Sequence, residues 1–186
     1  MTTICAGAVF LFIVVIIIII YQYQKKAEKR NIEQKKATAL KFAQRHVQII
    51  QESMELINKS KNLKTIIRRF DTILENVDRL IVLAKQYDYP DITKPVPSEM
   101  KEFYTKDRER FIREYVLEQV ADEIERAKTI TRKPSKIAIL DKALLLLFDG
   151  KKALRDENQV GVILEKEKEI RDLIKHINSD KNLMEV

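Results

Sequence analysis

The sequence predicts an all-α protein, in which a single N-terminal transmembrane helix continues through a stalk into a bundle of about five helices. Three observations lead to this fold class. The stretch from Ile4 to Tyr21 carries no charge, the 186 residues include only three glycines and four prolines, and apolar residues recur at helical spacing along most of the chain. So few turn-forming residues are typical of a helical protein.

The stretch from Ile4 to Tyr21 has the length of a membrane span. As a helix, its 18 residues would extend about 27 Å, close to the roughly 30 Å hydrocarbon core of a bilayer. No Lys or Arg precedes it, and no small-residue cleavage site follows it. We therefore expect residues 1–24 to be an anchor and not a cleaved signal peptide. Cys5 is interpreted as a small apolar residue of this anchor, with S-acylation as the alternative.

Basic residues directly after the span predict its orientation. Residues 25–38 form a basic stalk, and the positive-inside rule places this flank in the cytoplasm and the N-terminus outside. The predicted location is the cell inner membrane, with one span and a cytoplasmic bundle. Six residues are expected at the membrane interface: Tyr21, Tyr23, Lys25, Lys26, Lys29 and Arg30.

The net charge of +7 is concentrated at the start of the chain. Residues 1–50 contain eight Lys or Arg and two Glu, whereas residues 51–186 are almost balanced. A nucleic-acid-binding domain would need a basic face of its own. The predicted partners are therefore the membrane and a protein or a second copy of the chain, without nucleic acid.

The predicted bundle covers residues 39–178 and begins with a helical hairpin at residues 39–87. Apolar residues from Ala39 to Ile57 define one helical face, and a second stripe from Leu63 to Ala84 repeats at steps of three and four. A short turn rich in Lys and Asn between them favours antiparallel packing. Such heptads also occur in intermolecular coiled coils, which stay an alternative.

Residues 88–97 form a proline-rich break, interpreted as a rigid linker, with a proline-rich ligand segment as the alternative. Helices are expected over residues 98–178. Ser98 is predicted to cap the first of them, and the charged run at 107–111 is interpreted as a solvated face.

The apolar run from Ile137 to Phe148 is predicted to be the central buried helix of the bundle. Asp149 and Gly150 should end it, because glycine tolerates the left-handed conformation of a helix end. An amphipathic helix with Val160 and Ile177 near its ends follows, and residues 179–186 are expected to be a flexible tail.

The sequence offers no constellation for catalysis. His46 and His176 stand far apart without a second His or Cys at ligand spacing, and Asp122, Glu123 and Glu125 lack the Glu-x-x-His elements of a di-metal bundle. Three scattered glycines exclude the usual phosphate-binding loops. We expect no enzyme activity, no metal, no cofactor and no small-molecule substrate.

One segment, about residues 52–83, resembles a recurring pattern in small helical bacterial and phage proteins. The shared residues are Glu52, Ser53, Leu56, Ile57, Ser60, Lys61 and Asn62, followed by Arg69 and Phe70 on the next helix. The resemblance implies a helical fold and a bacterial or phage origin. That group has no assigned activity, so the resemblance implies no site residue.

These observations predict a non-enzymatic, membrane-anchored protein that presents a cytoplasmic helical bundle for protein–protein interaction. Two alternatives remain open. The chain could be a phage-encoded membrane exclusion or host-modifying factor, or an envelope-facing lysis or surface component. Fold class alone does not choose among them.

Overall fold

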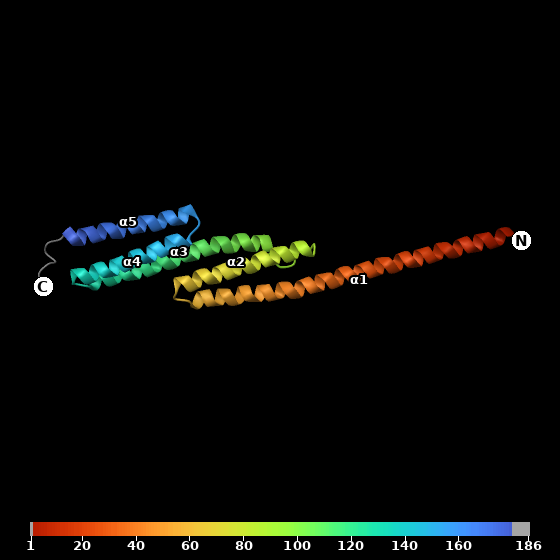
Figure 1. The fold of residues 1–186 in the computed structure, drawn as a ribbon, viewed down its shortest axis with the longest axis horizontal. Coiled ribbons are helices and arrows are strands. Elements are labelled where there is room, and N and C mark those ends of the chain that lie inside the picture. The colour runs from red at the N-terminus through yellow and green to blue at the C-terminus, as the bar shows by residue number, and fades with distance from the viewer. Residues whose placement is uncertain (1, 180–186) are drawn as a thin grey trace.

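The computed structural model describes the backbone of residues 2–179 and the side chains of residues 16–179. Within these residues the chain is all-helical, which confirms the all-α prediction. Its helices are α1 (Thr2–Lys59), α2 (Leu63–Gln86), α3 (Pro97–Thr129), α4 (Lys133–Ala153) and α5 (Glu157–Ser179). The molecule is elongated, because α1 runs far beyond the other four helices (Figure 1).

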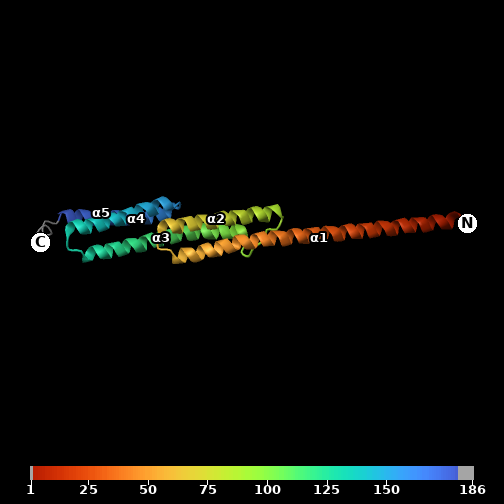
Figure 2. The same cartoon turned by 60° about the horizontal axis from the view of Figure 1, so that its bottom comes forward.

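Each helix packs against the next one along the chain, and α5 also contacts α3. The long α3 connects the two halves of this bundle. Its first part lies beside α2 and its second part beside α4, so that the α1–α2 hairpin and the α4–α5 pair are offset along the long axis (Figures 1 and 2). The predicted helical bundle is confirmed, with α3 as its central helix.

The core of the α1–α2 hairpin follows a heptad repeat. Buried and half-buried positions alternate at steps of three and four in α1, at Ala39, Ala43, His46, Ile50, Ser53 and Ile57. The same alternation occurs in α2, at Ile66, Phe70, Ile73, Val77 and Leu80. This spacing suits long helices that cross at a small angle. The heptads of α2 therefore serve packing within the chain.

A side-chain cap begins α2, and backbone hydrogen bonds end it. Asn62 begins the helix, and its side chain accepts a hydrogen bond of 3.3 Å from the Thr65 amide. At the other end, Asp88 adopts a left-handed φ of 48°. The amides of Asp88 and Tyr89 then donate to the carbonyl oxygens of Lys85 and Ala84, which is the Schellman arrangement.

Two predicted helix boundaries are wrong. The N-cap of α3 is Val96 and not Ser98, and Pro97 is its first residue. Gly150 does not end a helix, because α4 continues to Ala153. A Cβ added to Gly150 would lie 2.8 Å and 3.0 Å from the two γ carbons of Val116. Glycine is needed at this position for close contact between α3 and α4.

The predicted central position of α4 is also wrong. Its buried residues form one stripe, at Leu140, Ala143, Leu147 and Gly150. Leu145 and Phe148 on its outer side are 59% and 45% exposed. The residues of the apolar run are therefore divided between a packed face and a solvent-facing face of the same helix.

The prediction of a transmembrane helix at Ile4–Tyr21 is corrected by the structure. Among the residues that it describes, no helix is both long enough and apolar enough for a bilayer crossing. Described side chains in this stretch are apolar only from Ile16 to Ile20, about 8 Å of helix, before Tyr21 and the polar residues that follow. The rest of the predicted span, with Cys5, lies outside the described side chains.

The same finding overturns the predicted single-pass inner-membrane location, with its outward N-terminus and cytoplasmic bundle. Residues 25–38, the predicted basic stalk, are a continuous part of α1. The predicted flexible tail at 179–186 begins with the last residue of α5, and positions 180–186 lie outside the described residues.

Candidate functional site

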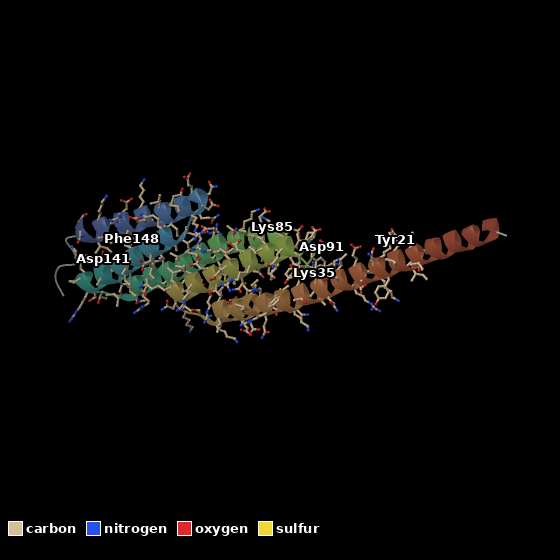
Figure 3. The ribbon with its side chains drawn as sticks, turned by 45° about the vertical axis from the view of Figure 1, so that its right-hand side comes forward. Tyr21, Lys35, Lys85, Asp91, Asp141 and Phe148 are labelled. Carbon is tan, nitrogen blue, oxygen red and sulfur yellow. The ribbon has the colours of Figure 1, made fainter. Side chains whose placement is uncertain are left out.

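The six predicted interface residues lie on the part of α1 that extends beyond the bundle. This projecting segment, residues 16–38, has an exposed side chain at every position. Tyr21 lies far from the other helices, whereas Lys35 lies near Asp91 at the end of the bundle (Figure 3). There Lys36 Nζ lies 5.1 Å from the centroid of the Tyr89 ring. Tyr21 and Tyr23 are 64% and 77% exposed. The structure divides five of the six residues between two open hollows on the surface of this helix, with Tyr21 and Lys25 at one and Tyr23, Lys26 and Arg30 at the other, and does not gather the six at one site.

A buried ionic cluster in α3 is the main polar feature of the bundle. Asp107, Arg108 and Glu109 are 8%, 3% and 6% exposed, although the sequence run suggested a solvated face. Arg108 Nη1 donates to Glu109 Oε1 at 2.7 Å and to the Ala153 carbonyl oxygen at 2.9 Å. The guanidinium thus donates a hydrogen bond to the last carbonyl group of α4 and neutralises the buried carboxylate of Glu109.

Glu109 extends this cluster to the connection between α4 and α5. Its Oε2 accepts hydrogen bonds from the amides of Arg155 at 2.7 Å and Asp156 at 3.2 Å. Removing one partner of a buried ion pair leaves the other charge uncompensated, at a cost of about 3–5 kcal/mol. The Arg108–Glu109 pair therefore holds the α4–α5 connection against the middle of α3.

The carboxylates singled out in the sequence do not converge. Glu123 is buried and accepts hydrogen bonds from Arg126 and Lys142, so it links α3 to α4. Asp122 and Glu125 are exposed. Within residues 16–179, no three His, Cys, Asp or Glu side chains form a set that could hold a metal ion.

The two histidines also remain apart. His46 Nδ1 lies 2.8 Å from Asn76 Oδ1, and Asn76 Nδ2 donates to the Thr72 carbonyl oxygen at 2.8 Å. Because Oδ1 is an acceptor, His46 is the donor of the first bond. This pair joins α1 to α2 inside the hairpin. His176 is exposed on α5.

A cavity of about 670 Å³ lies beside the ionic cluster, where α2, α3, α4 and the α4–α5 connection meet. Exposed cationic residues line it together with apolar side chains. Tyr115 is part of the lining, and the pKa of its phenol is raised, first by burial and then by the negative charge of Glu118. The phenol is therefore neutral at physiological pH.

The helical phase of α3 could have indicated the buried charges. Arg108 precedes the core residue Ile112 by four positions, and Glu123 precedes the core residue Ala127 by four positions. Residues so spaced share a face of a helix. The charged composition of the run hid this relation, and the sequence carries no signal for the α4–α5 backbone amides that Glu109 binds.

In comparisons with known proteins, no family model, no curated protein and no solved structure matches the chain.

Proposed function

We propose that the protein acts without catalysis as a helical interaction protein, and that the projecting segment of α1 binds a helix of a different protein. The observation that carries this proposal is the exposure of every side chain from Ile16 to Thr38. Contiguous exposed apolar surface rimmed by polar residues is a mark of interaction sites.

Five consecutive isoleucines, Ile16–Ile20, supply the apolar part of this surface. Each is 40–59% exposed. Because consecutive residues of a helix point in different directions, one partner helix would cover only the two or three isoleucines on one side of α1. Covering the exposed half of each such side chain contributes on the order of 1 kcal/mol. Most helices in proteins also depend on tertiary packing for their stability. A partner helix against the projecting segment would supply that packing.

Charge favours a different protein over a second copy. Beyond the isoleucines, the segment carries Lys25, Lys26, Lys29, Arg30, Lys35 and Lys36 against only Glu28 and Glu33. Two copies packed in parallel would place these basic residues side by side, and like charges across an interface are unfavourable. A helix with an apolar stripe followed by acidic residues fits better.

Site-specific photo-crosslinking tests the proposal. A photoreactive residue is placed at Ile18 or Ile32 in the projecting segment, at Leu145 on the outer side of α4, or at the exposed Lys168 on α5 as a control. We expect adducts with a second protein from Ile18 and Ile32, but not from Lys168. Mass spectrometry identifies the partner.

Three results would count against the proposal. Adducts from Leu145 alone would move the interface to the bundle, and adducts with another copy of the chain would replace the partner by self-association. Equal adducts from all positions would mean random collision. In a chain lacking residues 1–24, the adduct from Ile32 should be lost, because the isoleucines have been removed.

A further inference from the structure

The cavity between the two halves of the bundle has the composition of an anion-binding pocket with an apolar wall. Cationic residues come from four parts of the chain, at Lys61, Lys64, Arg108, Lys142, Lys152 and Arg155, against Glu123 and Asp149. Apolar contact surface is provided by Leu63, Ile67, Tyr115 and Leu146. Its volume of about 670 Å³ lies within the range of small-molecule sites.

The positive charges at the rim of the cavity are available to a ligand. Lys142 pairs with the buried Glu123, but Lys61, Lys64 and Arg155 are exposed and form no ion pair with any described residue. Lys61 and Lys64 stand at the N-terminal end of α2, where the helix dipole also favours negative charge.

Arg108 adds a buried positive charge to the wall of the cavity. Its side chain is 4% exposed, it lines the cavity, and its Nε has no hydrogen-bond partner in the part of the chain that the structure describes. This Nε is enclosed and forms an ion pair with Asp71 Oδ1 at 3.5 Å, too long for a good hydrogen bond, and Asp71 does not line the cavity. An oxyanion in the cavity would therefore interact with this guanidinium through its positive charge.

We propose that the cavity binds a small organic phosphate, with its phosphate group near Arg108 and the rim cations and its apolar part against Tyr115 and Leu146. A phosphate monoester suits this site better than a carboxylate does, because a phosphate group carries up to two negative charges at neutral pH and the rim offers several cations. The neutral phenol of Tyr115 adds no repulsive charge. This site is separate from the projecting segment and independent of the proposed function.

Phosphorus NMR titration of the full-length chain tests the proposal. Three probes separate the contributions: phenyl phosphate carries both parts of the ligand, inorganic phosphate only the anion, and phenol only the apolar part. We expect phenyl phosphate to bind at least tenfold more tightly than inorganic phosphate. Competition by unlabelled phenol, followed through the phenyl phosphate signal, should be weak.

Substitution of Arg108 would also disturb the fold, because Arg108 and Glu109 hold the α4–α5 connection. Substitutions of exposed rim residues test ligand binding without this effect. The triple variant Lys61→Gln, Lys64→Gln, Arg155→Gln removes three exposed charges and should weaken phenyl phosphate binding tenfold or more. The variant Lys26→Gln, Lys29→Gln, Lys35→Gln loses the same charge from the projecting segment and should bind like the unaltered protein.

Each contrary result overturns a defined part of the proposal. Equal affinity for inorganic and phenyl phosphate would refute the apolar half and leave a site for free phosphate. An equal loss in both triple variants would mean non-specific attraction to a basic protein. Unchanged binding in the rim variant, or no binding of either phosphate, would refute the site.

Discussion

Gly150 provides a sharp test of the packing between α3 and α4. An added Cβ would lie 2.8 Å from one γ carbon of Val116, closer than real Cβ contacts allow, and 3.0 Å from the other. Val116 is 1% exposed, and its branched side chain has little freedom about χ1 in a helix. The contact can be relieved only by moving one helix against the other. We therefore predict that Gly150→Ala destabilises the protein.

The size of the effect follows from two opposing terms. Alanine is favoured over glycine inside a helix by about 1 kcal/mol. A methyl group forced into a packed core costs roughly 1–3 kcal/mol. The expected net loss of stability is about 1 kcal/mol, which corresponds to a fall in Tm of about 2–4 °C for a chain of this size.

Gly161 in α5 is the matched control, because an added Cβ there meets nothing within 4 Å. Gly161→Ala should gain about 0.5–1 kcal/mol from helix propensity alone. Urea unfolding followed by circular dichroism measures both variants. In a Val116→Ala background, which removes the two γ carbons, Gly150→Ala should no longer destabilise. Equal stabilisation by Gly150→Ala and Gly161→Ala would refute the packing argument.

Three further substitutions test local features of the fold. Asp88→Gly should stabilise the protein by about 1 kcal/mol in urea unfolding, because glycine adopts the left-handed φ of 48° without strain; unchanged or lower stability would contradict this. Asn62→Ala should cost about 1 kcal/mol by removing the N-cap of α2, whereas Asn62→Asp should retain most of the stability. Hydrogen bonding to Arg171, aided by Lys151, lowers the pKa of Glu167, so its contribution is present above the usual value of 4.5 and is lost as pH falls through the lowered pKa. Glu167→Gln should therefore reduce stability by about 0.5 kcal/mol near neutral pH and by progressively less as the pH falls below 4.5, as thermal unfolding across that range would show.

Helical periodicity was a good guide wherever a helix has one apolar face. The stripes of α2 and α5 place Phe70, Ile73, Ile163 and Ile170 in the core, as their spacing predicts. The composition of a run of residues was a poorer guide to which of its side chains are buried. The apolar run in α4 suggested a central helix, yet Leu145 and Phe148 face outward, and the charged run in α3 suggested a solvated face, yet Arg108 and Glu109 are buried.

The correction of the transmembrane prediction has a different origin. The span was predicted from the length of one uncharged apolar stretch and from its flanking residues, and among the residues that the structure describes no helix is long and apolar enough to cross a bilayer. The predicted basic stalk after Tyr21 is part of one helix that continues to Lys59. These residues follow an apolar run in the sequence, but in the structure their side chains are exposed on a projecting helix.

The amino-acid sequence alone was sufficient for the all-α class, the helical hairpin at the start of the bundle and the helical phase of its core, because these depend on residues three and four positions apart. Only the tertiary structure decided that α3 is the central helix, that Gly150 is a contact point and that Arg108 joins Ala153 and Glu109. Arg108 and Ala153 are distant in sequence, and local spacing carries no information on such a pair. The cavity beside Arg108 exists because these distant segments meet there.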